Sequence, residues 1–131
     1  MIGLDTNVVV RFLTQDDPAQ AAQATTLFAS LTEDEPGYLC REVMVELVWV
    51  LERAYRLARV DIAAAIDELL ASREIVIEDA DRVGQANEHY RQGGAGFSDQ
   101  MIALGGRDAG CSAVFSFDRQ GIASAGMTAV P

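Results

Sequence analysis

The sequence contains no lysine, and all ten of its basic residues are arginines. A Walker-type phosphate loop needs a lysine to reach the phosphates of its nucleotide, so the chain does not fit that class of nucleotide-binding proteins. Receiver domains and haloacid-dehalogenase-type phosphotransferases also use a lysine beside an acidic pocket. The absence of lysine therefore argues against the common protein classes that bind or transfer phosphoryl groups at such a pocket.

Histidine and cysteine are also scarce. His89 is the only histidine and lies within an expected helix, which argues against a histidine-based metal site or catalytic triad. Cys40 and Cys111 are the only cysteines, and they lack the paired spacing of a metal-binding motif. We expect both to pack as small buried hydrophobic residues.

Long apolar runs are absent as well. The longest uncharged stretch, from Pro18 to Thr32, is interrupted by Gln, Thr and Ser, so we expect no membrane-spanning segment. Asp5 comes so early that neither the basic nor the apolar region of a secretory signal precedes it. This pattern favours a cytoplasmic location.

Positive charge is in short supply. Twenty acidic residues against ten basic ones give a formal net charge of −10, so the free protein should repel a polyanion. Two bound divalent cations would offset four of these charges and still leave the chain negative. Any binding of nucleic acid must therefore depend on local arginines and on metal.

The length of 131 residues and the 50% hydrophobic content predict one domain, residues 1–131, with a single core. Apolar segments typical of short strands alternate with segments of helical periodicity, which indicates an α/β fold with a mostly parallel sheet covered on both faces. Strands are expected at residues 1–4, 37–40, 74–77, 111–117 and 127–130. Helices are expected at residues 6–13, from Pro18 onward behind an Asp17 cap, at 42–56, from an Asp61 cap to 72, from Asp79 onward, and from a Ser98 cap onward.

Four acidic residues stand out against this pattern. Asp5 and Asp118 end expected strands, Asp99 opens an expected helix, and Glu46 flanks an apolar helical stripe. Each alone has an ordinary explanation as a cap or an exposed helical residue. Ligands of parallel sheets bind at the carboxyl ends of strands, where the four carboxylates are expected to meet.

Such a cluster needs protons or cations, because carboxylates about 4 Å apart repel by roughly 4 kcal/mol per pair at an effective dielectric constant near 20. Mg²⁺ and Mn²⁺ prefer hard oxygen ligands of this kind. The sequence therefore indicates a divalent-metal site.

These residues also carry a family resemblance. The segments around the four acids resemble the acidic motifs of PIN-domain nucleases, in order and at typical spacing: Asp5-Thr6-Asn7, Glu46-Leu47, Phe97-Ser98-Asp99 and Ser116-Phe117-Asp118-Arg119. The stretch from Arg11 to Pro18 further resembles the VapC-like ribonucleases, the toxins of bacterial type II toxin-antitoxin systems. Two departures are mild: Gln100 stands where a small Ala is expected, and Ser116 replaces a more usual Thr.

The resemblance implies a PIN-like three-layer α/β/α sandwich that cleaves RNA with Mg²⁺ or Mn²⁺, through a metal-activated water. It implies Asp5 as the central ligand, Asp99 and Asp118 as ligands on either side, and Glu46 as a direct or water-mediated ligand. It also implies a homodimer and a cognate antitoxin whose basic side chain enters the acidic groove.

Supporting roles are less sharply indicated. Asn7 and Ser116 are expected to orient waters or the scissile phosphate by hydrogen bonds. Arg11 and Arg41 are candidate RNA contacts, although spaced arginines are more often solvated. Trp49 lies off the apolar stripe and either marks an interface or packs under a neighbouring helix.

Two alternatives remain open. A PIN-like nuclease for RNA maturation or DNA processing would share every site residue. A non-enzymatic acidic Mg²⁺-binding module is the second alternative, which the missing lysine disfavours.

Overall fold

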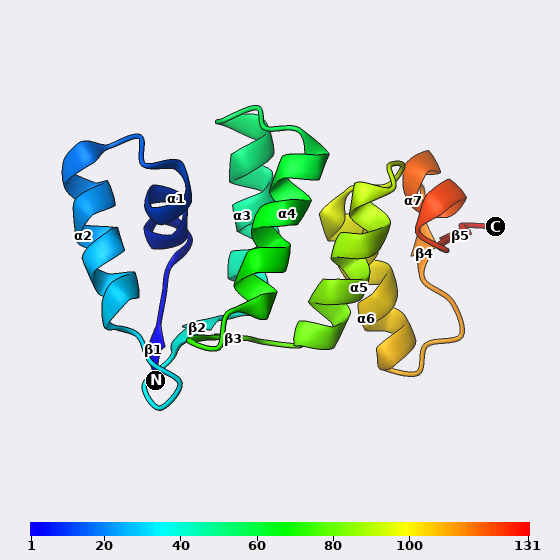
Figure 1. The fold of residues 1–131 in the computed structure, drawn as a ribbon. Helices are drawn as coiled ribbons and strands as arrows, with labels where there is room; N and C mark the ends of the chain where they lie inside the picture. The colour runs from blue at the N-terminus through cyan, green and yellow to red at the C-terminus, as the bar shows by residue number, and fades with distance from the viewer. The chain divides into compact units, whose positions relative to one another are not determined.

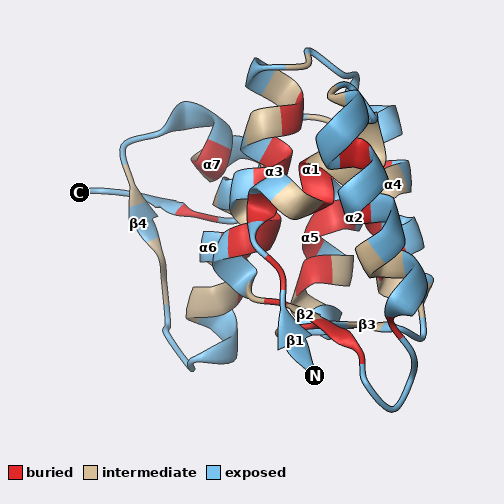
Figure 2. Cartoon of the chain, turned by 90° about the vertical axis from the view of Figure 1, so that its left-hand side faces the viewer, coloured by how far each residue is buried: buried red, intermediate tan, exposed pale blue.

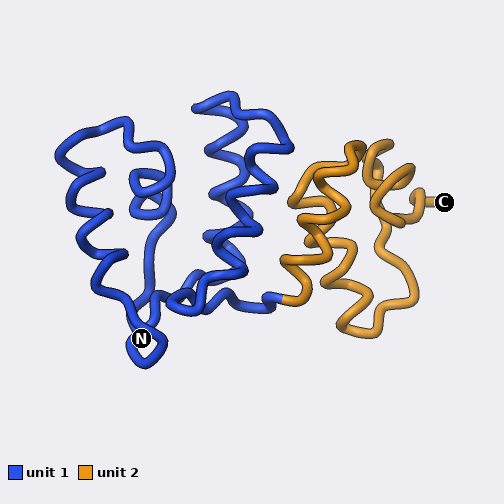
Figure 3. Tube along the Cα trace, viewed as in Figure 1, with its two compact units in different colours: residues 1–80 blue, residues 81–131 orange.

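The computed structural model describes residues 1–131, which form two compact units, residues 1–80 and residues 81–131 (Figure 3). No helix in either unit combines the length and the apolar character needed to cross a membrane. That the two units function as one domain stays a prediction.

Unit 1 is built on a three-stranded parallel sheet in the order β1-β2-β3 (Figure 1). The register pairs Ile2 with Gly37 and Gly37 with Ile75. Parallel neighbours require crossover connections, and helices supply them here. The elements of this unit are β1 (Ile2–Gly3), α1 (Thr6–Thr14), α2 (Pro18–Ser30), β2 (Gly37–Leu39), α3 (Arg41–Arg53), α4 (Arg59–Ala71) and β3 (Ile75–Ile77).

The core of unit 1 follows the helical periodicity of the sequence. Helix α1 packs on α2 and α3, and α3 packs on α4. Figure 2 shows buried residues running along the inner faces of these helices. The buried side chains recur every three to four positions on α3 and α4, which places them on one face of each helix: Val43, Met44, Leu47, Val48, Leu51, Ile62, Ala63, Ile66 and Leu69.

Unit 2 is mainly helical and carries a parallel pair of two-residue strands, β4 and β5. The ring of Tyr90 meets the ring of Phe97 edge to face, with centroids 5.9 Å apart, which joins the end of α5 to the start of α6. The elements are α5 (Ala80–Arg91), α6 (Phe97–Asp108), β4 (Phe115–Ser116), α7 (Arg119–Ser124) and β5 (Thr128–Ala129). The predicted α/β class with parallel strand pairing is confirmed.

Two predicted helix caps are wrong. Helix α4 begins after Ala58 rather than Asp61, and Asp61 lies in its first turn. Helix α6 begins after Gly96 rather than Ser98. The physical reason at α6 is that Phe97 is only 1% exposed, so the helix starts early enough to place this ring on its buried face.

Two predicted boundaries also move. The strand expected at residues 111–117 is only β4, because the chain turns at Gly110, with φ of 87°, and leaves Cys111 exposed rather than buried. Helix α3 ends at Arg53 rather than Arg56, since Arg56 takes a left-handed conformation with φ of 53° that a helix cannot continue.

Candidate active site

Asp5 lies where the chain leaves β1 and enters α1. It is the N-cap of α1, and its Oδ1 atom accepts a hydrogen bond of 2.8 Å from the backbone N–H of Thr6. The Thr6 hydroxyl is buried without a hydrogen-bond partner, which leaves it available to a water molecule beside Asp5. Asn7 is exposed in the first turn of the same helix. Asp5 therefore keeps carboxylate oxygen free for a ligand while it caps the helix.

Glu46 lies on α3 in the same unit. Its neighbour Leu47 is fully buried, whereas Glu46 is exposed beside the apolar face of the helix. The sequence predicted this flanking position from the helical period. The rigid packing of α3 fixes the backbone from which this carboxylate projects.

Asp99 and Asp118 are brought together within unit 2. Asp99 lies in the first turn of α6, and Asp118 is the N-cap of α7, where its Oδ1 atom accepts a hydrogen bond from Gln120. The two carboxyl groups are within hydrogen-bonding reach of each other. Partial burial of Asp99, the charge of Asp118 and this hydrogen bond raise the pKa of Asp99 above its ordinary value.

The four acids thus divide into Asp5 and Glu46 in unit 1 and the Asp99–Asp118 pair in unit 2. Within neither unit do three or more acidic, histidine or cysteine side chains gather into a metal-binding group. That all four converge on one metal centre stays a prediction.

The chemistry of the donors fits a divalent metal. All four side chains offer carboxylate oxygens, the ligand type that Mg²⁺ and Mn²⁺ prefer. None of them forms an ion pair with an arginine, whereas other acidic side chains such as Asp16, Asp79 and Asp108 do. The Asp99–Asp118 pair is therefore a site of uncompensated negative charge, which a cation would stabilise.

Ser116 lies in β4, two residues before Asp118. Its Oγ atom accepts a hydrogen bond of 2.9 Å from the backbone N–H of Asp118. In this structure the hydroxyl therefore orients the backbone of the acidic residue. The predicted contact of Ser116 with water or phosphate stays a prediction.

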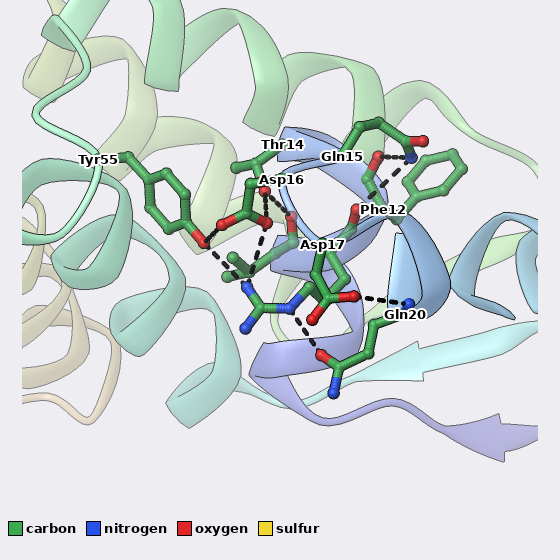
Figure 4. Close-up of polar contacts among 9 residues, drawn as sticks. Phe12, Thr14, Gln15, Asp16, Asp17, Gln20 and Tyr55 are labelled. Atoms are coloured by element: carbon green, nitrogen blue, oxygen red, sulfur yellow. Dashed lines mark hydrogen bonds and ion pairs between the residues drawn. The ribbon is translucent and has the colours of Figure 1, made fainter. Parts of the chain in front are cut away.

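Arg11, the first candidate RNA contact, belongs to a polar network at the end of α1. Its Nη1 atom donates hydrogen bonds to Asp16 at 3.2 Å and to Tyr55 at 2.9 Å, and its Nε atom donates to Gln20 at 2.7 Å. Figure 4 shows Asp16, Tyr55 and Gln20 turned toward this network, which ties α1 to the start of α2 and to the segment after α3.

Arg41, the second candidate, pairs with Glu78 at 3.6 Å and with Asp79 at 3.0 Å. Its backbone N–H also donates to Glu78. Both candidate arginines are thus already engaged within unit 1, and their predicted contact with RNA stays a prediction.

A polar groove of about 420 Å³ opens beside Asn7, between α1 and α2. Asn7, Arg11, Gln20 and Gln23 supply amide and guanidinium groups to it, and Ala24 and Leu27 are among its apolar lining. The groove was not anticipated from the sequence, because the residues of α2 approach α1 only after the chain has turned through Asp16 and Asp17.

Sequence reasoning also missed Gln100 and its partner Ser124 in the Asp99–Asp118 region. Gln100, noted in the sequence only as a departure from Ala, is 2% exposed and donates a hydrogen bond to the Ser124 carbonyl. The signal was available, since Gln100 falls on the apolar stripe that Phe97, Met101 and Leu104 define on α6. A polar residue at such a position needs a buried hydrogen-bond partner.

The structure is an α/β protein in which Asp99 and Asp118 lie together, and carboxylate oxygens are donors that divalent metals prefer. The family model of the PIN domain matches residues 2–126, and the chain belongs to this family. PIN domains are generally metal-dependent nucleases, so the chain has the fold of a hydrolase that acts on nucleic acid. A comparison with curated proteins gave no match.

Proposed function

We propose that the chain is an Mg²⁺- or Mn²⁺-dependent endoribonuclease and the toxin of a toxin-antitoxin module. The observation that carries the nuclease proposal is the contact between Asp99 and Asp118, two carboxylates without an arginine partner in a PIN domain. Two carboxylates this close repel each other, and a bound divalent cation would offset that repulsion.

In this proposal Asp5 is the central metal ligand, Asp99 and Asp118 bind on either side, and Glu46 binds directly or through water. A bound divalent ion would lower the pKa of a water molecule and stabilise the negative charge on the phosphate. The caps at Asp5 and Asp118 restrict the rotamers of these ligands, so the chain fixes their oxygens before the metal arrives.

The groove beside Asn7 supports a path for RNA away from Asp5. Its amide groups can read the edges of an unstacked base, and the Arg11 guanidinium adds a positive charge to the groove. The net charge of −10 means that substrate affinity must come from such local contacts and from metal. We therefore place single-stranded or loop RNA in this groove.

The same net charge favours a basic protein partner, and we propose a cognate antitoxin that places a basic side chain against the acids. We also propose a homodimer. Trp49 is 57% exposed on α3 with the guanidinium of Arg53 5.8 Å from its ring, and large exposed aromatic residues are enriched at interfaces. Sedimentation of a Trp49→Ala variant tests this, because unchanged dimerisation contradicts a role of Trp49 in the interface.

Cleavage of labelled single-stranded RNA by the purified full chain tests the enzyme proposal. We expect cleavage with Mg²⁺ or Mn²⁺ and none with EDTA. Asp5→Asn and Asp99→Asn should each lower the rate by at least 100-fold. Asp34→Asn is the matched control, because it removes the same charge from an exposed loop outside the site. Undiminished cleavage by both site variants contradicts the mechanism.

Expression in a bacterial host tests the toxin role separately. Growth should stop with the wild-type chain, continue with Asp99→Asn, and resume when the product of the neighbouring gene is co-expressed. Cleavage in the test tube without growth arrest points instead to RNA maturation or DNA processing. Sequencing of RNA 5′ ends after brief expression identifies the target.

A further inference from the structure

We infer that Gln100 and Ser124 form a clamp that positions Asp118 against Asp99 for metal binding. This inference rests on the proposed function, since it concerns the same acidic pair. Both residues lie outside the set that the sequence motifs mark as ligands. They are positioning residues, because they act through the helix that Asp118 caps.

The clamp holds Ser124, the last residue of α7, by two hydrogen bonds. One comes from a residue just before α6 begins, and the other comes from the first turn of α6. The Gln100 side-chain amide donates to the Ser124 carbonyl at 3.2 Å. The backbone N–H of Ala95 donates to Ser124 Oγ at 2.7 Å, and this hydroxyl donates to the Gln120 carbonyl at 2.9 Å. Asp99 lies in the sequence between Ala95 and Gln100, so the two bonds to Ser124 flank the first acid of the pair.

The clamp reaches Asp118 because α7 is short. The helix runs only from Arg119 to Ser124, with Asp118 as its N-cap, so fixing its last residue restricts its whole axis. The clamp adds to the close approach of Gly121 to Met127 and to the hydrogen bond from the Met127 backbone N–H to the Gly121 carbonyl, which also hold this helix. Movement of the axis would carry the Asp118 carboxylate away from Asp99.

The burial of Gln100 shows that its amide serves more than packing. The side chain is 2% exposed, and burial of a primary amide is unfavourable unless it is hydrogen-bonded. An apolar side chain of similar length would fill the same space at lower cost. The bond to the Ser124 carbonyl offsets this cost and ties α6 to the end of α7.

Gly94 shows that the clamp also requires close approach of the backbone. Its φ of 83° favours glycine, and a Cβ atom at this position would lie 2.5 Å from Ser124 Oγ. The loop before α6 can therefore approach Ser124 only with glycine at this position. The close contact and the two hydrogen bonds point to the same residue of α7.

Binding of Mn²⁺ to the full chain, followed by electron paramagnetic resonance of the free ion, tests the inference without RNA. We expect Gln100→Met to weaken Mn²⁺ binding about tenfold, as loss of a group that orients a metal ligand typically does. Val83→Ala is the matched control, because it truncates a fully buried side chain of α5 in the same unit and changes none of the hydrogen-bonding groups of the clamp. Its Mn²⁺ affinity should equal that of the wild type.

Ser124→Ala provides a second variant in case Gln100→Met does not fold. It removes the exposed hydroxyl that accepts from Ala95, and we expect weaker Mn²⁺ binding in the same direction. In RNA cleavage at saturating Mn²⁺, either variant should lower kcat and leave KM for RNA unchanged, because the clamp positions metal ligands and not substrate.

Wild-type affinity in Gln100→Met and Ser124→Ala overturns the inference. Equal loss of affinity in Gln100→Met and Val83→Ala also overturns it, since the effect would then reflect general destabilisation. Asp99→Asn distinguishes a failure of the clamp from a failure of the proposed metal site. If it abolishes Mn²⁺ binding while the clamp variants bind normally, only the clamp is wrong; if it binds Mn²⁺ normally, the proposed metal site and the clamp both fail.

Discussion

The Tyr55 hydroxyl donates a hydrogen bond of 2.6 Å to Asp16 Oδ2, which joins the loop after α1 to the segment after α3. This bond and a second from Thr14 hold the pKa of Asp16 below its ordinary value. A lowered pKa in the folded state means that the interaction favours the ionised carboxylate. Because Arg11 donates to both partners, the pair also fixes the candidate RNA-binding guanidinium.

Tyr55→Phe should therefore reduce stability in a pH-dependent way. The contribution of ionised Asp16 is fully present above its unfolded pKa of about 3.9 and is lost as the pH falls through the lower folded pKa. We expect the variant to unfold at lower urea concentration than the wild type at pH 7, and the difference to shrink below pH 4. Urea titrations across this range measure it. Tyr38→Phe is the control, and a difference for Tyr55→Phe that does not change with pH contradicts the prediction.

Asp118→Asn should lower the pKa of Asp99 in the metal-free protein. Burial of Asp99 remains in the variant, so its pKa should fall only part of the way to the ordinary value. A raised folded pKa gives stability that is present below the unfolded pKa and lost as the pH rises, so the variant should lose less stability than the wild type between pH 4 and 7. Carbon-13 NMR titration of the Asp99 carboxyl reports the pKa, with Asp108→Asn as a variant in which no change is expected.

Leu47→Ala and Glu46→Gln should separate folding from function at adjacent positions of α3. Leu47 is fully buried, so its truncation should lower the free energy of unfolding by about 2–5 kcal/mol. Glu46 is exposed, so Glu46→Gln should change stability by no more than about 0.5 kcal/mol while it weakens Mn²⁺ binding. Urea unfolding and Mn²⁺ titration of both variants check this. Strong destabilisation by Glu46→Gln would assign that residue to the fold and not to the metal.

Arg41→Gln should weaken RNA binding in a salt-dependent manner. Loss of one phosphate contact reduces the slope of log affinity against log salt concentration by about 0.7 for a single strand. Binding to the inactive Asp99→Asn background, measured at several salt concentrations, gives this slope. Arg73→Gln is the control, because its side chain is exposed and contacts only Glu33 at 3.7 Å. An unchanged slope would limit Arg41 to its ion pairs with Glu78 and Asp79.

The elements that the sequence predicted best are those with strong periodicity or a complete cap. The Asp17 cap with Pro18 at the first helical position fixed the start of α2, and the structure confirms it through the bond from Gln20 to Asp17. The cap of helix α6 was placed two residues too late, at Ser98 rather than Gly96, because the burial of Phe97 outweighed the capping preference of Ser98. Capping contributes about 1 kcal/mol, which is less than the burial of an aromatic ring provides.

The sequence by itself determined the α/β class and the family, because both depend on the order and spacing of short local patterns along the chain. It also predicted the four acids as metal ligands from the same patterns. Only the tertiary structure decided that Asp99 contacts Asp118, that Gln100 bonds to Ser124, and that Arg11 is held by Asp16 and Tyr55. These contacts join residues that lie 5 to 44 positions apart, and no local preference encodes them. They follow from the packing of elements that are distant in the chain, which places groups beside one another that the sequence keeps apart.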